Sequence, residues 1–161
     1  MSESIRLAQT APIVMFGLMA GFFYAFSVCV MPGLDRLPPT EAIGAMQAIN
    51  VAVRNPVFFV TFFLTPLVAF GAAALAFQMG ETRRAASMAS AALVYSLLAA
   101  VPTALVNVPM NEALAAVEPA RVDAGAVWTA YSDRWTGWNT MRTVTATLAL
   151  ALALHPFPQK G

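Results

Sequence analysis

The stretch PVFFVTFFLTPLVAFGAAALAF, residues 56–77, carries no charged side chain and decides the class of the fold. A helix needs about 20 mostly apolar residues to cross the roughly 30 Å hydrocarbon core of a bilayer. Pro56 suits the first turn of such a helix, because the backbone N–H that proline lacks would have no partner there. The stretch therefore predicts a membrane-spanning α-helix in an all-α protein.

Three further apolar stretches, one before it and two after it, are predicted to span the membrane as well. They run over residues 11–31, 85–106 and 138–155, and the first is too long and too regular for a cleaved signal peptide. Backbone groups in lipid must be hydrogen-bonded within the protein, so four spans predict an antiparallel four-helix bundle. With no internal boundary or repeat, residues 1–161 are expected to form a single transmembrane domain.

The composition agrees with this class and excludes several kinds of function. The 161 residues are 59% hydrophobic and 11% charged, with a mean hydropathy of +0.68, whereas a soluble domain carries about 25% charged residues. The net charge of +1 gives no indication of nucleic-acid binding. The single cysteine, Cys29, excludes an internal disulfide and a cysteine-based metal cluster. The single histidine, His155, argues against a haem or di-iron centre, so no metal and no cofactor are predicted.

The distribution of basic residues predicts the orientation in the membrane. They are most concentrated near the chain ends and in the link between the second and third spans: Arg6, Arg83, Arg84 and Lys160. The connections 32–55 and 107–137, on the opposite side, hold most of the acidic residues. By the positive-inside rule both termini are expected in the cytoplasm, with the protein in a bacterial cytoplasmic membrane.

Each long connection is expected to contain one short amphipathic helix. In the first, Thr40 is a candidate N-cap for a helix over residues 41–54, whose apolar residues repeat every three or four positions. In the second, residues 123–135 have helical character. Aromatic residues there recur at spacings of three and four: Trp128, Tyr131, Trp135 and Trp138. Such a stripe is typical of an aromatic belt with packing at the membrane interface, and a wall for a ligand is the alternative.

Arg142 is the most unusual residue of the predicted spans. The apolar stretch 143–155 is too short to cross a bilayer and is closed by prolines, so the fourth helix must extend upstream and take Arg142 below the interface. A charge at the bilayer centre costs on the order of 2.5–3.5 kcal/mol on insertion scales, and somewhat less near the edge. Two interpretations stay open: a side chain that snorkels to the headgroups, or a buried polar site.

Polar and aromatic residues gather at the outer ends of the spans, which an antiparallel bundle would bring together. The candidate site residues are Tyr24, Asn50, Arg54, Asn107, Asn111, Glu112, Trp135, Trp138, Asn139 and Arg142. Arg142 is expected to bond to the amide oxygens or to the carboxylate of Glu112, and Pro102 and Pro109 are expected to disturb the end of the third span. An apolar body with a few directional polar groups is typical of a ligand pocket, although single asparagines fit interhelical packing equally well.

Five sequence motifs are distinctive as a set: Gly21–Val28, Met31–Leu34, Met46–Asn50, Asn107–Asn111 and Trp135–Arg142. The Asn-Val-Pro-x-Asn and Trp-x-x-Trp-Asn-x-x-Arg elements are the most specific. Together they resemble the anthrone oxygenase-like family of small four-span membrane proteins, most of them uncharacterised, over about residues 12–154. The resemblance implies oxidation of an anthrone to an anthraquinone by molecular oxygen, without a metal or a flavin.

The resemblance also implies roles for the candidate residues. Arg142 or Arg54 would stabilise the negative charge of a substrate enolate, and Glu112 would be the base that forms it. The implied substrate contacts are the amides of Asn107, Asn111 and Asn139, the stacking rings of Trp135 and Trp138, and the side chains of Asn50 and Tyr24.

Two other functions stay open at this point. One is a non-catalytic accessory protein that binds a lipid or quinone in a larger membrane complex, since no catalytic triad, metal set or nucleotide loop is recognised. A small transporter is less favoured, because Ser87, Ser90, Ser96 and Thr103 form only a thin polar trail. The partners expected are membrane lipid and a hydrophobic aromatic or quinone-like molecule, with a homo-oligomer or larger complex left open and no nucleic acid.

Overall fold

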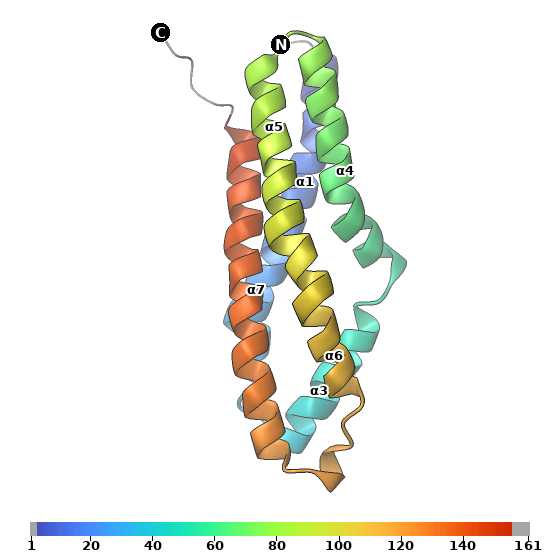
Figure 1. Cartoon of the computed structure of the whole chain (residues 1–161), viewed down its shortest axis with the longest axis vertical. Helices are drawn as coiled ribbons and strands as arrows, with labels where there is room; N and C mark the ends of the chain where they lie inside the picture. Colours follow the sequence, from blue (N-terminus) through green and yellow to red (C-terminus); the bar gives the residue numbers. More distant parts are fainter. Residues whose placement is uncertain (1–2, 156–161) are drawn as a thin grey trace.

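The computed structural model describes residues 3–155, and every regular element within them is helical (Figure 1). The α-helices are α1 Glu3–Ala25, α2 Met31–Leu34, α3 Pro39–Ala52, α4 Pro56–Gln78, α5 Thr82–Tyr95, α6 Val108–Ala115 and α7 Ala124–Leu154. The remaining elements are the π-helical segments η1 Phe26–Val30, η2 Ser96–Ala100 and η3 Thr103–Asn107 and the 3-10 turn η4 Pro119–Arg121. The predicted all-α class is confirmed.

Several of these segments join end to end into longer helical columns. The first column passes through η1 and α2 as far as Leu34, so Pro32 and Gly33 do not end it, contrary to the predicted span 11–31. Three helices have the length and apolar composition of a membrane span: Leu7–Leu34, Pro56–Gln78 and Thr82–Ala115. The chain is therefore an integral membrane protein.

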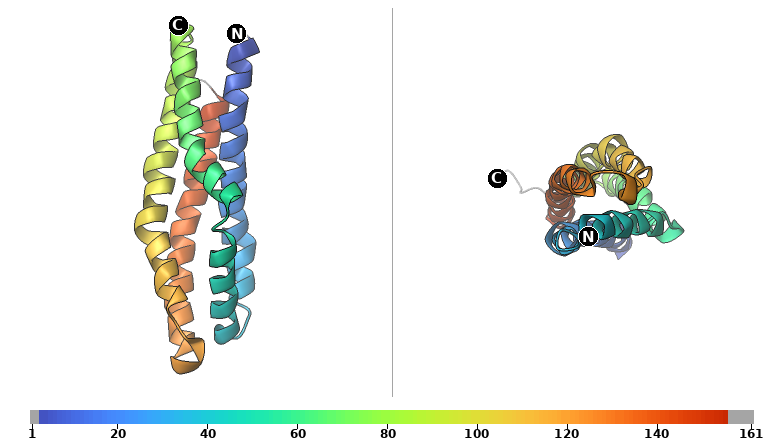
Figure 2. Two further views of the ribbon diagram at one scale, coloured as in Figure 1. Left: turned by 90° about the vertical axis from the view of Figure 1, so that its right-hand side faces the viewer. Right: turned by 90° about the horizontal axis from the view of Figure 1, so that it is seen from below.

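The long helices α1, α4, α5 and α7 lie side by side (Figures 1 and 2). α1 packs against α4 and α7, and α5 packs against the same two helices. Large side chains such as Phe16 and Tyr95, whose rings meet edge to face at 5.6 Å, share the core between them with many alanines. The alanines allow close approach of the helix backbones, which is the usual basis of helix packing in membranes.

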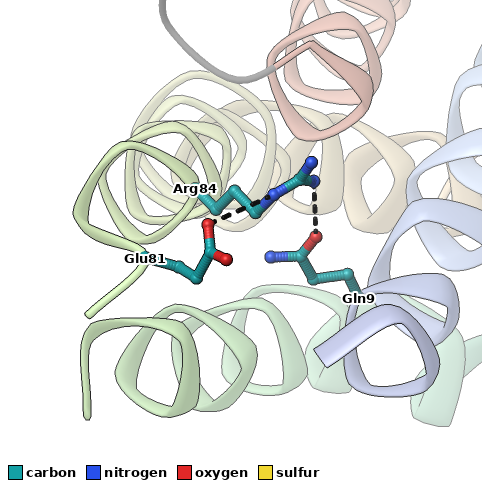
Figure 3. Close-up of polar contacts among 3 residues, drawn as sticks. All are labelled: Gln9, Glu81 and Arg84. Atoms are coloured by element: carbon teal, nitrogen blue, oxygen red, sulfur yellow. Dashed lines mark hydrogen bonds and ion pairs between the residues drawn. The ribbon is translucent and has the colours of Figure 1, made fainter. Parts of the chain in front are cut away.

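A polar cluster holds the end of the molecule at the α4–α5 turn (Figure 3). Gly80 makes this turn with a φ of +79°, a conformation that favours glycine. Arg84 of α5 donates a hydrogen bond to Gln9 Oε1 of α1 at 3.4 Å, and its Nε lies 3.7 Å from the carboxylate of Glu81. The cluster therefore ties α1 to the α4–α5 hairpin.

At the opposite end, α3 lies beside α6 and α7 and builds a second core. Its buried members include Ala42, Ile43 and Met46 of α3 and Trp128, Tyr131 and Trp135 of α7. Trp128 also donates its indole N–H to Asp35 Oδ1 at 2.9 Å. These three aromatic residues are at most 7% exposed, so the predicted packing of the aromatic stripe between helices is confirmed for them.

The start of α3 differs from its prediction. The helix begins at Pro39, and the residue at its N-cap, Pro38, makes no side-chain hydrogen bond. Proline is preorganised for the first helical turn, so Pro39 starts the helix and leaves Thr40 inside it. The prediction that Thr40 caps this helix is therefore wrong.

The second connection also differs from its prediction. Residues 123–135 do not form a separate short helix, because Asp123 caps α7 by accepting the Ala126 N–H at 3.0 Å and the helix then continues to Leu154. α7 spans 31 residues, and Arg142 lies near its middle. The prediction that the helix extends upstream of Arg142 is confirmed, and packing by neighbouring helices buries the Arg142 side chain.

Candidate functional site

A cavity of about 210 Å³, called the central cavity below, lies where α1 and η1, α3, α4, η3, α6 and α7 meet. Its apolar wall consists of Phe22, Phe26, Ile49, Val53, Phe58, Phe59, Phe62, Phe63, Val108 and Trp135. Its polar residues are Asn50, Arg54, Thr103, Asn107, Asn111, Glu112 and Arg142. An aromatic enclosure with a few polar groups is the usual construction of a small-molecule site.

The space arises because α3 and α4 are joined by a cap and not by a continuous helix. Asn55 makes this junction: its Oδ1 accepts the N–H of Phe58 at 3.0 Å, and its Nδ2 donates to the carbonyl of Ala52 at 2.9 Å. Beyond the cap, the N-terminal part of α4 stands away from α7 (Figure 1). Phe58 and Phe62 of this part of α4 line the cavity.

Two prolines shape the wall that the third column contributes. Pro102 and Pro109 lack the backbone N–H that an α-helical turn uses, and π-helical segments lie next to both. The prediction that these prolines disturb the end of the third span is confirmed. The segment η3 begins at Thr103 and ends at Asn107, and both side chains line the cavity. Such wide turns occur frequently at functional sites.

Arg142 is only 4% exposed and is held from several sides. Its Nη1 donates to Thr103 Oγ1 at 2.9 Å and its Nη2 to Asn139 Oδ1 at 3.0 Å. The guanidinium carbon lies 4.7 Å from the centroid of the Phe23 ring and 5.3 Å from that of the Trp135 ring, which are cation–π distances. No carboxylate among the described side chains, residues 7–155, pairs with it. Arg142 is therefore a buried cation without a counterion, and it does not snorkel.

Asn139 positions Arg142 from behind the cavity wall. It is fully buried, and its Nδ2 donates to the Phe23 carbonyl at 2.7 Å and to Ser27 Oγ at 2.8 Å. These two bonds orient the Asn139 amide so that its Oδ1 faces Arg142. The predicted pairing of Arg142 with Asn139 is confirmed, whereas Glu112 makes no ion pair with Arg142 in the described part of the chain.

Buried polar atoms without a protein partner concentrate at the central cavity. Within the described side chains they are Arg142 Nε, Asn107 Nδ2, Asn107 Oδ1, Asn50 Nδ2 and, at the far end of the molecule, Gln9 Nε2. Asn107 is 1% exposed, so neither end of its amide reaches bulk solvent. A buried polar group left unpaired costs about 1–3 kcal/mol. The cavity therefore presents three free donors and one free acceptor, a set suited to a ligand with an anionic oxygen.

Asn111 organises the aromatic side of the cavity. Its Oδ1 accepts the Tyr131 hydroxyl at 2.9 Å and the Trp135 indole N–H at 2.8 Å. These two bonds fix the Trp135 ring, which lies 5.6 Å from the Phe26 ring.

The family model named anthrone oxygenase matches residues 54–152. The chain belongs to the anthrone oxygenase family. The matched region covers more than half of the chain and includes η3, α6 and the Trp135–Arg142 segment of α7. No curated protein and no solved structure matches the chain. In this member of the anthrone oxygenase family, the roles of individual residues therefore have to be argued from the site itself.

The structure brings seven of the ten candidate residues to the central cavity: Asn50, Arg54, Asn107, Asn111, Glu112, Trp135 and Arg142. Arg54 and Glu112, which both line the central cavity, have exposed side chains. Asn139 lies behind the wall. Tyr24 is 58% exposed and does not line the cavity, and Trp138 lines a separate surface depression beside Arg134.

Sequence reasoning missed Thr103 and the phenylalanines of α4 as site residues. Thr103 precedes Asn107 by four positions, a helical spacing that places both on one side, and this signal was available in the sequence. Phe58 and Phe62 have the same spacing, but identical spacings occur on faces that meet lipid. Among the described residues, no group of three or more His, Cys, Asp or Glu side chains could hold a metal ion.

Proposed function

We propose that the central cavity binds a planar aromatic carbonyl compound as its enolate or phenolate, and that the protein oxidises this anion with molecular oxygen. The single observation that carries the proposal is Arg142, a buried cation with a free Nε and, among the described side chains, no carboxylate partner, on a cavity walled by aromatic rings. Membership of the anthrone oxygenase family supports an anthrone as the substrate class.

The proposed reaction converts an activated methylene group into a carbonyl group. The methylene loses a proton and becomes an electron-rich enolate, whose carbon gives an electron pair to O₂ and forms a carbon–oxygen bond. The resulting peroxide takes up a proton and loses water, so one oxygen atom remains as the new carbonyl and the other leaves as water. Carbon is oxidised and O₂ is reduced in the same step, with no further oxidant required.

Arg142 and Asn107 supply the electrostatic part of this chemistry. Opposite charges 4 Å apart attract each other by about 4 kcal/mol at an effective dielectric constant of about 20. Applied to a bound enol beside Arg142, that energy favours ionisation by roughly a thousandfold. Asn107 Nδ2, also unpaired, is a second donor for the oxyanion. Glu112, at the cavity rim, is the candidate base for the methylene proton.

We also propose that α7 is a fourth span, which completes an antiparallel four-helix bundle with α1, α4 and α5. Its packing against α1 and α5 supports this assignment, because the most polar residue of the predicted span, Arg142, is covered by protein. The concentration of basic residues supports termini in the cytoplasm and a central cavity toward the outer face. Two variants, Glu81→Cys and Glu118→Cys, each made in a Cys29→Ser background, test this orientation. A thiol reagent should reach the two introduced cysteines from opposite sides of the membrane.

The exposure of Glu112 favours a second candidate function. A site with a buried cation but no buried base suits binding of a compound that is already an anion, such as a hydroxyquinone, without turnover. In this case the protein would be a membrane-embedded quinone-binding protein.

The decisive experiment compares wild type with Arg142→Gln in purified protein supplied with an anthrone. Oxygen uptake and anthraquinone absorbance report turnover, and quenching of tryptophan fluorescence reports binding. Arg121→Gln is the matched control, because Arg121 is exposed and pairs with Glu118 away from the cavity. Loss of turnover in Arg142→Gln alone supports the oxygenase. Binding without turnover in wild type supports the second candidate, and binding and turnover that are both equal in all three proteins contradict both candidates.

A further inference from the structure

A second depression of about 470 Å³, called the lateral groove below, adjoins the central cavity on the side of α1 and α4. The two spaces share five wall residues: Phe22, Phe26, Ile49, Val53 and Phe58. Three of these are rings in contact, with centroids 4.9 Å apart for Phe22 and Phe26 and 5.0 Å apart for Phe22 and Phe58. The partition between the two spaces is therefore a single layer of side chains.

The lateral groove has a chemical character opposite to that of the central cavity. Its polar members are Asn55 and Thr61, and both are occupied: Asn55 caps α4, and Thr61 Oγ1 donates to the Val57 carbonyl at 2.9 Å. Its rim includes Leu18 and Val57, which are 59% and 78% exposed on two of the helices apolar enough to cross a membrane. The groove therefore offers a ligand apolar contact without any free hydrogen-bonding group.

We infer that the ligand is an amphiphile: its aromatic head, with the acidic oxygen, lies in the central cavity against Arg142, and an apolar chain attached to that head lies in the lateral groove. This inference rests on the proposed anion site. Its own support is the shared wall: three phenylalanine rings have unpaired polar atoms on one side and, on the other, a surface without a free hydrogen-bonding side chain.

The sizes of the two spaces favour this arrangement. Ligand pockets commonly enclose about 300–1,000 Å³, so the central cavity alone is small for a complete ligand, whereas the two spaces together fall within that range. A chain that leaves between Phe22 and Phe58 also gives the head direct access from the hydrocarbon of the membrane. A compound of low water solubility could then reach Arg142 without passing through water.

The test is a photolabelling experiment on the whole protein in lipid nanodiscs. The probe is 2-hydroxy-1,4-naphthoquinone, an acidic planar ring, carrying an octyl chain that ends in a diazirine. Mass spectrometry then locates the label. We expect adducts concentrated on Leu18, Ala52 and Val57, lost when excess unlabelled 2-hydroxy-1,4-naphthoquinone occupies the head site, and lost in Arg142→Gln.

A matched pair of variants tests the groove itself. Leu18→Trp fills the lateral groove, so the photolabel should no longer concentrate on the groove residues. Binding of 2-hydroxy-1,4-naphthoquinone without the octyl chain should be unchanged. Leu67→Trp, at a residue that is 62% exposed on α4 and lines neither space, should leave both labelling and ring binding unchanged. Thermal unfolding of each variant in the same nanodiscs shows whether the fold is retained.

The outcomes separate this inference from the proposed function. If the ring binds through Arg142 but the label spreads evenly over lipid-facing helices, the amphiphile inference fails and the anion site stands. If the groove is labelled regardless of competitor and of Arg142, it holds an ordinary lipid chain, and the inference again fails. If 2-hydroxy-1,4-naphthoquinone does not bind at all, both the proposed anion site and the amphiphile inference are contradicted.

Discussion

Arg142 and Asn139, one helical turn apart on α7, share a hydrogen bond of 3.0 Å in which Arg142 Nη2 donates to Asn139 Oδ1. The amide nitrogen of Asn139 is committed to α1, through the Phe23 carbonyl at 2.7 Å and Ser27 Oγ at 2.8 Å. This arrangement connects a cation on α7 to the backbone of another helix, α1. The position of the guanidinium is therefore set by helix packing as well as by its own helix.

Asn139→Ala should destabilise the protein and weaken anion binding together. The substitution removes the hydrogen bond to the Phe23 carbonyl and leaves one guanidinium donor of Arg142 without its partner, and a buried unpaired group costs about 1–3 kcal/mol. Thermal unfolding in detergent measures the first effect and hydroxynaphthoquinone titration the second. Thr140→Ala, at the exposed neighbour that also contacts Ser27, should change little. An unchanged melting temperature in Asn139→Ala would show that the hydrogen bonds of Asn139 to α1 and to Arg142 do not stabilise the fold.

Asn107→Leu should raise stability while it abolishes ligand binding. Both polar atoms of this amide are buried without a protein partner, so an apolar side chain of similar size removes a penalty of about 1–3 kcal/mol. Groups that function requires are often unfavourable for stability in this way. Melting temperature and ring binding, measured on the same preparation, should move in opposite directions.

Asn111→Leu is the matched comparison, and it should lower the melting temperature, whereas Asn107→Leu should raise it. Asn111 Oδ1 accepts from both Tyr131 and Trp135, so its removal leaves two buried donors unpaired and should lower the melting temperature. If Asn107→Leu and Asn111→Leu destabilise equally, the free amide of Asn107 is structural and not reserved for a ligand.

Arg142→Lys should retain the fold but lose most of the function. Lysine keeps the charge, yet it lacks the planar fork that reaches Thr103 and Asn139 at the same time. Losing one hydrogen bond to a charged group corresponds to about 1.5–3 kcal/mol, which is about tenfold or more in affinity. Titration with an anionic ring compound measures this change. Wild-type affinity in the lysine variant would mean that charge alone, without geometry, defines the site.

Glu112→Gln should separate catalysis from binding. Glu112 is at the exposed rim of the central cavity, so the amide should leave ring binding intact and, if the carboxylate is the base, lower the turnover of an anthrone. Glu118→Gln, at an exposed glutamate that does not line the cavity, is the control. Full turnover in Glu112→Gln would assign proton removal to water or to another group.

Much of the architecture could be predicted from local pattern. The apolar stretch 56–77 corresponds to α4, and Pro102 with Pro109 marked the π-helical end of the third column. The predictions failed where a neighbouring element overrode local signals. The helix α3 starts at Pro39 and not after a cap at Thr40. Residues 123–135 are part of α7 because Asp123 caps this helix and no proline interrupts it before Leu154.

The sequence by itself determined that this protein lies in a membrane, since long apolar stretches have no other stable environment, and it singled out Arg142 as a charge in an apolar setting. It did not determine which polar groups meet. The lean of α4 after the Asn55 cap and the wide turns of η3 decide that Thr103 and Asn139 satisfy Arg142 while Asn107 stays unpaired. Helical spacing accounts for the contact between Arg142 and Asn139, which are three residues apart. The contacts of Arg142 with Thr103 and of Asn139 with Phe23 join residues far apart in the chain, so helical periodicity does not encode them and only tertiary packing brings them together.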